Sequence, residues 1–181
     1  METNLNLKGT KSEANLRAAL SGESIARNKY TYYAQQARKE GLEDVANLYE
    51  RMAKNESEHA KIWYKYLNGE MKSTMNNLYE SASGEGYEYS NMYPKFAQIA
   101  REEGFEELAK RFENIAEIEH NHELTFMKAM ANITQKNTTF EPEQKEAEKK
   151  YEYRCVFCGK VSDKPLDVCP VCEAIGAFQH I

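Results

Sequence analysis

The chain has 181 residues, of which 29% are charged, 9 are glycine and 4 are proline. This length suits one ordinary domain with a small appendage, and the composition suits a helical protein with solvated outer faces. The formal net charge of −5 gives no reason to expect nucleic acid or an anionic membrane as a partner. No apolar run approaches the roughly 20 residues that cross a bilayer, and the N-terminus does not resemble a signal peptide. We therefore expect a cytoplasmic protein.

Four long helices are predicted, over residues 10–40, 43–67, 73–103 and 106–132. Thr10 and Glu13 form a capping box at the start of the first helix, and Gly41 and Gly104 end the first and the third. Pro94 is expected to kink the third helix. Four long helices joined by short turns predict an antiparallel bundle.

The helical part contains an internal repeat with a period of 63 residues. Residues 30–59 aligned with residues 93–122 share 13 identities in 30 positions, among them Glu56 with Glu119 and His59 with His122. The bundle is therefore predicted to consist of two copies of one helix hairpin, facing each other across a pseudo-twofold axis. A pair of metal ions suits that symmetry.

The helical pattern ends after residue 133. Residues 134–150 are polar and lack an apolar stripe, which is typical of a linker. A compact module over residues 151–181 carries all four cysteines. We therefore predict a helical domain over 1–133, a linker and a C-terminal domain.

Two of the predicted helices carry charged residues on the stripe that should face a core. The stripes are Val45, Tyr49, Met52, Glu56, His59, Trp63 and Tyr66 on the second helix, and Leu108, Phe112, Ile115, Glu119, His122 and Phe126 on the fourth. A glutamate and a histidine three positions apart interrupt each stripe. The first helix adds Glu23 on a similar face, and the third adds Glu85 and Glu88.

A buried carboxylate without a partner would normally take up a proton or find a cation. No lysine or arginine lies on these stripes apart from Arg27 at the margin, so metal ions are the simplest partner. Each of the seven acidic and histidine side chains lies roughly 22–29 Å from its hairpin turn at 1.5 Å per residue, which places them in one layer. A network of charges, or histidines satisfied within the core, is the alternative interpretation.

This layer has the ligand pattern of carboxylate bundles with two metals, in which two helices supply a glutamate and the other two supply Glu-x-x-His. Carboxylates and imidazoles suit iron or manganese. Glu56 and Glu119 come from the two halves of the repeat and are the expected bridging ligands.

The cysteines form two Cys-x-x-Cys pairs, Cys155 with Cys158 and Cys169 with Cys172. Such pairs in a chain without an export signal bind metal more often than they form disulfides. Four thiolates take zinc or a single iron, and the spacing does not choose between them. The context favours iron, because an iron centre can carry electrons to a redox-active pair of metals and a zinc centre cannot.

Several segments together resemble the rubrerythrin family: GESIARNKY, NESEHA, GEGYEYSNMYPKFAQIAREEGFEELA, EIEHNHE and YRCVFCG…DVCPVC. The resemblance covers nearly the whole chain. It implies an all-α fold, in which an antiparallel four-helix ferritin-like bundle is followed by a small metal-stabilised rubredoxin-like domain.

The resemblance also implies roles for individual residues. The di-iron ligands carry over to Glu23, Glu56, Glu85, Glu88, Glu119 and His122, and the ligands of the single iron to Cys155, Cys158, Cys169 and Cys172. His59 resembles a ligand that replaces Glu88 when the site is reduced. Tyr30 and Tyr93 resemble a pair of tyrosines near the irons, which we interpret as core packing with a hydrogen bond to a carboxylate rather than as radical chemistry.

The activity that the resemblance implies is reduction of hydrogen peroxide to water at an oxo- and carboxylate-bridged di-iron centre. The four-cysteine iron would re-reduce this centre with electrons from rubredoxin or an NADH:rubredoxin reductase. The chain itself has no dinucleotide-binding fingerprint. Family members form dimers in which the four-cysteine domain of one subunit lies near the di-iron centre of its partner, so a homodimer is expected.

Two other functions compete with this one. The chain could be a ferritin-like ferroxidase or iron-storage protein, against which stand Glu88 and the electron-carrying tail. It could instead be a non-catalytic protein that binds partners through a structural zinc ribbon. A ferric four-cysteine centre is red and a zinc centre is colourless, so an absorption spectrum separates the zinc-ribbon alternative from a protein with a four-cysteine iron centre.

Overall fold

The structure is a computed structural model that describes residues 6–134 and 153–180. It divides into two compact units, Met1–Met71 and Lys72–Ile181. The predicted linker lies outside the described residues except for Thr134. Among the helices that the structure describes, none is both long enough and apolar enough to cross a membrane.

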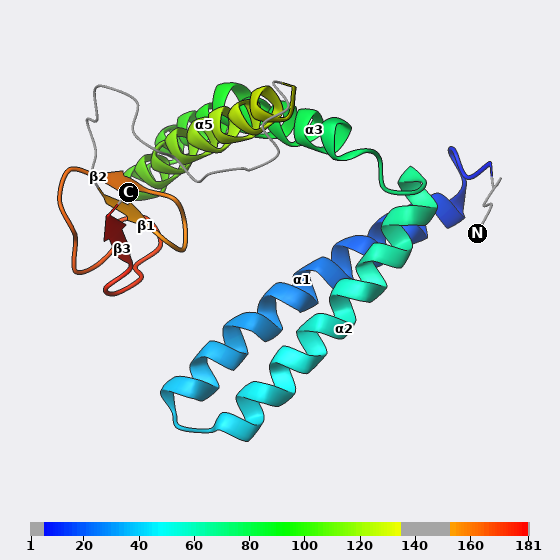
Figure 1. Ribbon diagram of the computed structural model, residues 1–181, viewed down its shortest axis with the longest axis horizontal. Helices are drawn as coiled ribbons and strands as arrows, with labels where there is room; N and C mark the ends of the chain where they lie inside the picture. Colours follow the sequence, from blue (N-terminus) through cyan, green and yellow to red (C-terminus); the bar gives the residue numbers. More distant parts are fainter. Residues whose placement is uncertain (1–5, 135–152, 181) are drawn as a thin grey trace. The chain divides into compact units, whose positions relative to one another are not determined.

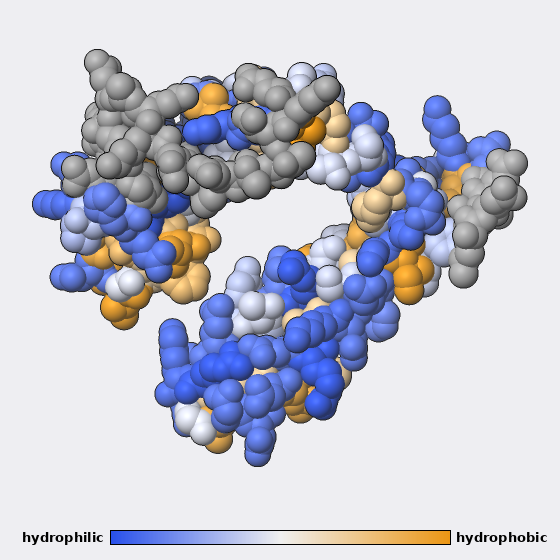
Figure 2. Space-filling view, viewed as in Figure 1, coloured by the Kyte–Doolittle hydropathy of each residue, from blue (hydrophilic) through white to orange (hydrophobic). Residues whose placement is uncertain are grey.

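The first unit is an antiparallel hairpin of helices α1 (Lys11–Lys39) and α2 (Glu43–Asn68) (Figure 1). The predicted cap is present, because the Thr10 hydroxyl accepts a hydrogen bond of 3.1 Å from the backbone N–H of Glu13. Gly41 closes the hairpin with a φ of 76°, a conformation that favours glycine. The visible surface of this unit is largely hydrophilic, as the composition predicted (Figure 2).

The second unit contains a matching hairpin whose first arm is interrupted. Helix α3 (Thr74–Tyr87) is followed by a π-helical turn, η1 (Glu88–Met92), and then by α4 (Tyr93–Glu102). The return arm is α5 (Glu106–Thr134). The single helix predicted over residues 73–103 is therefore corrected to three segments. The break lies immediately before Pro94, which cannot donate a backbone hydrogen bond to the preceding turn.

The repeat predicted from the sequence is visible in the packing beside the two hairpin turns. The buried alanines there, with an adjoining aromatic residue, are Ala34, Ala37, Ala46 and Tyr49 in the first hairpin and Ala97, Ala100, Ala109 and Phe112 in the second. Each residue of the second group follows its counterpart by 63 positions. Small side chains allow the two arms to approach closely at the turn. Both hairpins therefore have the same packing of alanines beside their turns.

The C-terminal module in the second unit has a three-stranded antiparallel sheet of order β2-β1-β3. Strand β1 (Tyr153–Cys155) pairs with β2 (Val161–Ser162) on one side and with β3 (Phe178–His180) on the other. Its core contains Cys155, Cys169, Val171 and Ala177, together with Ile118 of α5. The module therefore shares its apolar core with the helix that carries Glu119 and His122.

Candidate metal centres

The first hairpin brings three of the predicted ligands together. Glu23 of α1 and the pair Glu56 and His59 of α2 each offer an atom, and these atoms lie within 4.8 Å of one another. His59 Nδ1 is 2.8 Å from Glu56 Oε2 and 3.9 Å from Glu23 Oε1. The i, i+3 spacing on α2 places both side chains on one face, as the sequence predicted.

The second hairpin repeats this arrangement with Glu85 of α3 and with Glu119 and His122 of α5. His122 Nδ1 is 2.7 Å from Glu119 Oε2 and 3.7 Å from Glu85 Oε2. The two triads thus agree in residue type and in the ring nitrogen that faces the carboxylates. Within each hairpin, the predicted common height of the ligands is therefore observed.

The electrostatics of the second triad fit a bound cation. Burial raises the pKa of Glu85, and the neighbouring carboxylate of Glu119 raises it further. Burial also raises the pKa of Tyr93, with added repulsion from Glu88, Glu119 and Glu85. Negative groups therefore converge at this point, and a divalent ion would relieve their repulsion. Carboxylate and imidazole donors suit iron or manganese.

Each triad lies on a partly exposed face of its own hairpin. The Glu56 and Glu119 side chains are 18% and 14% exposed, while those of His59 and His122 are 52% and 43% exposed. Each triad supplies three of the seven predicted ligands. The bridging of two metals by Glu56 and Glu119 stays a prediction.

Glu88 does not belong to the triad of the second hairpin and begins the π-helical turn instead. The reason lies in the register of the repeat. Seven positions separate Glu23 from Tyr30, whereas eight separate Glu85 from Tyr93. A π-helical turn accommodates one additional residue within a helix, so η1 keeps both Glu85 and Tyr93 in their equivalent places. The extra residue was a sequence signal for this turn.

The sequence analysis missed a cluster beside the second triad. The Glu123 carboxylate occupies the space over Gly86, where a Cβ atom would lie 2.6 Å from its Oε1. His120 Nδ1 is 3.2 Å from Glu123 Oε2, and the His120 ring stacks on Tyr89 with centroids 4.3 Å apart. The signal was again in the repeat, because Glu123 corresponds to Ala60 and, once the extra residue of η1 is counted, Gly86 corresponds to Ser24. The second hairpin therefore has a carboxylate at a position where the first has a small side chain.

The two predicted tyrosines lie in aromatic clusters. The Tyr30 ring is 6.0 Å from that of Tyr49, and the Tyr93 ring is 6.0 Å from that of Phe112. These contacts are equivalent in the repeat, which agrees with a packing role for both tyrosines. Glu85 and Glu119 of the second triad raise the pKa of Tyr93, so the Tyr93 hydroxyl lies near that triad.

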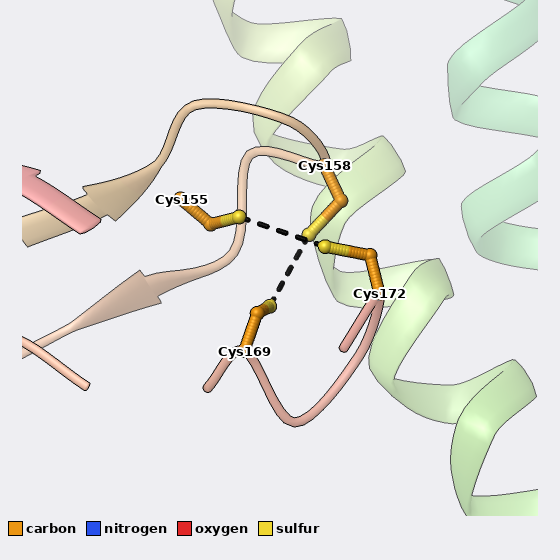
Figure 3. A group of neighbouring side chains, drawn as sticks. All are labelled: Cys155, Cys158, Cys169 and Cys172. Atoms are coloured by element: carbon orange, nitrogen blue, oxygen red, sulfur yellow. Dashed lines mark hydrogen bonds between the residues drawn. The ribbon is translucent and has the colours of Figure 1, made fainter. Parts of the chain in front are cut away.

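The four cysteines converge on one point (Figure 3). Cys155 Sγ is 3.6 Å from Cys172 Sγ, and Cys158 Sγ is 3.6 Å from Cys169 Sγ. A tetrahedral ion with metal–sulfur bonds of about 2.3 Å would set its sulfurs about 3.8 Å apart, so the arrangement fits such an ion closely. All four are free cysteines rather than disulfides.

The surroundings of three of the four thiols shift their pKa values, in different directions. Burial raises the pKa of Cys158 well above its ordinary value, and burial raises that of Cys172. A metal ion binds the thiolate and displaces the proton, so it would make all four sulfurs equivalent donors. The four predicted cysteine ligands thus lie together and offer the thiolate donors that iron or zinc binds.

Comparisons with known proteins identify the family of this chain. A family model described as Rubrerythrin matches residues 14–130. A rubrerythrin of Porphyromonas gingivalis is 37% identical over 191 residues, covering 98% of this chain and 92% of that protein. A rubrerythrin of Nitratidesulfovibrio vulgaris is 38% identical over 180 residues, covering 92% and 91%. A solved structure of nigerythrin in a partially reduced state is 27% identical, with a TM-score of 0.41 and coverage of 100% and 92%. The chain belongs to the rubrerythrin family.

Proposed function

We propose that the protein reduces hydrogen peroxide to water at a di-iron centre built from the two triads, and that the four-cysteine module supplies the electrons. Family membership supports the coarser part of this statement, because it implies an iron protein and an oxidoreductase that works with electron donors. The observation that carries the proposal is the presence of two matched carboxylate–histidine triads and a four-thiolate site in one chain.

Reduction of one hydrogen peroxide consumes two electrons and two protons and yields two water molecules, and a pair of ferrous ions would supply the two electrons. The residues that would hold them are Glu23, Glu56, His59, Glu85, Glu88, Glu119 and His122. Glu56 and Glu119 would bridge the pair. Carboxylates can change their mode of binding as the charge of a bound ion changes, so these side chains would hold the ions in both oxidation states.

Glu88 and His59 have separate proposed roles. Glu88 lies in the π-helical turn, outside the triad, which suits a carboxylate that binds in only one oxidation state. The resemblance implies that His59 takes its place on reduction. The half-exposed His59 ring has room for such a movement within its hairpin.

The four-cysteine module would hold one iron and return the electrons. Apolar side chains surround its knuckles and are exposed: Val156 is 52% exposed, Phe157 68% and Ile175 82%. Such a surface next to the thiolates suits brief contact with a protein donor. We propose rubredoxin or an NADH:rubredoxin reductase as that donor, a homodimer as the assembled form and a cytoplasmic location.

A substitution of Glu85 tests the proposal directly. Glu85→Ala removes one ligand of the second triad, and we expect the variant to bind less iron at the carboxylate centre and to lose most peroxide turnover with reduced rubredoxin as the donor. Glu80→Ala, on the same helix but paired with Lys72, is the matched control and should retain both properties. Iron analysis and the rate of peroxide consumption are the measurements.

The same assay separates the ferroxidase alternative. A peroxide reductase consumes peroxide in proportion to the reduced rubredoxin supplied, whereas a storage protein would take up many irons per chain. Full peroxide turnover by the Glu85→Ala variant would contradict the proposed centre.

A further inference from the structure

The π-helical turn η1 is bonded within itself by its own polar side chains. The Ser90 hydroxyl donates a hydrogen bond of 2.6 Å to the carbonyl oxygen of Gly86, and the Asn91 amide donates one of 2.7 Å to Ser90 Oγ. Bonds from a serine to the carbonyl four residues earlier are common where a helix departs from its regular course. These bonds join residues 86–91 to one another, so they do not fix the place of the turn against α5.

Helix α5 contacts the chain on both sides of Glu88. On the N-terminal side, the Glu123 carboxylate lies over Gly86, where a Cβ atom would be 2.6 Å from Oε1. On the C-terminal side, the Tyr89 ring stacks on that of His120 with centroids 4.3 Å apart. His120 Nδ1 is 3.2 Å from Glu123 Oε2, and this contact joins the other two. We call Gly86, Tyr89, His120 and Glu123 the η1 latch.

The latch is partly withdrawn from water. The side chains of Glu123 and His120 are 27% and 42% exposed. Tyr89 and His120 also line a cavity of about 420 Å³, which they share with Lys160 and Ser162 of the four-cysteine module. One side of the stacked rings therefore opens into this cavity. Stacking restricts the orientation of Tyr89 from the other side, so His120 limits the movement of the turn.

The first hairpin has neither the latch nor the turn. His120 and Glu123 correspond there to Ser57 and Ala60, and these side chains reproduce neither the stacked ring nor the carboxylate. Helix α1 runs without interruption over Lys11–Lys39. The latch and the extra residue of the second hairpin thus occur together, which indicates that the latch serves the turn.

The turn determines where Glu88 lies. Glu88 is the first residue of η1 and stands between the two contacts of the latch. Its carboxylate acts on Tyr93 together with those of Glu85 and Glu119, so it lies near the second triad without belonging to it. Moving the extra residue elsewhere along the helix would rotate Glu88 by about 100° relative to Glu85. The carboxylate would then leave the triad.

We propose that His120 and Glu123 are positioning residues that hold η1 against α5 and thereby keep the Glu88 carboxylate beside the second triad. The inference rests on the proposed function, in which Glu88 binds an iron, and adds the residues that keep this ligand within reach. A ligand that leaves and returns needs a fixed backbone, and residues around a metal centre commonly supply one. Both residues act through the turn rather than by contact with an iron.

Gly86→Ala tests the latch at little cost to the fold. Gly86 lies in α3 and has no positive φ, and alanine is the better helix former. Its added Cβ meets the flexible end of the Glu123 side chain and displaces that carboxylate. Gly84→Ala is the matched control, because it brings the same gain in helix propensity and its Cβ would meet nothing within 4 Å.

Hydrogen exchange of the backbone amides over residues 87–93 is the first measurement, on the full chain loaded with iron. We expect several-fold faster exchange in Gly86→Ala, because the turn opens more often without the latch. In Gly84→Ala the exchange should be no faster than in the unmodified protein. Helix propensity alone would slow exchange in both variants, so an acceleration in one of them isolates the latch.

Two substitutions of Glu123 separate its contact from its charge. Glu123→Ala and Glu123→Gln both remove the negative charge, but glutamine keeps a side-chain amide that can bond to His120. We expect Glu123→Ala to exchange as fast as Gly86→Ala and Glu123→Gln to restore most of the protection. Equal exchange in the two Glu123 variants would show that the contact does not hold the turn.

Mössbauer spectroscopy of the oxidised, iron-loaded chain shows whether the latch acts through Glu88. We expect Gly86→Ala to change the quadrupole splitting of one iron bound by oxygen and nitrogen, and Gly84→Ala to leave the spectrum as it is. In a chain that already carries Glu88→Ala, Gly86→Ala should bring no further change, because the residue through which it acts is gone.

The outcomes are distinct. Unchanged exchange in both Gly86→Ala and Glu123→Ala would overturn the latch. Faster exchange with an unchanged spectrum, or the same spectral change with and without Glu88, would overturn its role in placing that ligand. If peroxide failed to oxidise the carboxylate centre of the unmodified protein, the proposed function would be wrong, while amide exchange would still decide whether the latch holds η1.

Discussion

His59 and His122 show how much the surroundings of one residue type can differ within a repeat. Both rings direct Nδ1 toward two carboxylates of their own triad. Nε2 of His122 additionally approaches the glycine that follows a cysteine knuckle. The pKa of Glu85 beside it is raised by burial and by Glu119, so metal binding at this triad should weaken as the pH falls.

The interpretation of Tyr93 as a packing residue can be tested by removing its hydroxyl. Tyr93→Phe keeps the ring contacts with Phe96 and Phe112. We therefore expect unchanged iron content and a loss of peroxide turnover far smaller than the roughly 10²-fold or more that follows removal of a general acid. Tyr30→Phe is the matched control from the other hairpin. A loss of that larger size in Tyr93→Phe alone would show that the hydroxyl takes part in the chemistry.

At individual positions the sequence predicted both triads and all four cysteines of the module. Its assignment of Glu88 as a ligand stays a prediction, and it missed the contact between Glu123 and His120. Helical periodicity assigns a residue to a face but assumes a constant pitch. The π-helical turn changes the pitch between Glu85 and Tyr93, and only the spacing within the repeat reveals it.

The two hairpins are closed by equivalent ion pairs. Arg38 contacts Glu43 and Glu50, and the repeat reproduces this as Arg101 with Glu106 and Glu113. The hydrogen bond from Arg101 lowers the pKa of Glu113, and that from Arg38 lowers the pKa of Glu50. All of these groups are at the surface, so each pair contributes little by itself.

These lowered pKa values predict how acid affects the hairpins. A carboxyl whose pKa is lower in the folded state stabilises the fold above its unfolded value of about 4.3, and this contribution is lost as the pH falls through the folded value. Arg101→Met should therefore lower the melting temperature slightly at neutral pH and have no effect in strong acid. Lys110→Met, which breaks a single i, i+3 pair, is the control.

Thermal unfolding followed by circular dichroism at the two pH values is the measurement. An equal loss of stability at both would show that Arg101 acts through packing of its aliphatic stem rather than through Glu113.

Among the elements, the helices were largely predictable because caps and glycines mark their ends. The helix predicted over 43–67 is observed as Glu43–Asn68, and the one over 106–132 as Glu106–Thr134. The exception is the predicted helix over 73–103. Pro94 correctly marked the place of the irregularity, but a proline does not determine whether a helix bends, ends or takes a wider turn.

For the molecule as a whole, the repeat and the cysteine pairs predicted two hairpins and a metal module. The contact of the module with α5 was not predicted. It depends on Arg111, Glu117 and Ile118, and these residues differ from their counterparts in the first hairpin, which is seen only when both halves of the repeat are compared. The domain boundaries at residues 133 and 151 stay a prediction. The central claim is that one chain holds two kinds of iron centre, one of carboxylates and histidines and one of thiolates.

Mössbauer spectroscopy of the protein reconstituted anaerobically with enriched iron tests that claim most directly. It distinguishes iron bound by oxygen and nitrogen from iron bound by four sulfurs. The account predicts both signals in a ratio of two to one, with the first changing on addition of peroxide. A spectrum that contains only the thiolate-bound iron, in protein whose triads are intact, would contradict it.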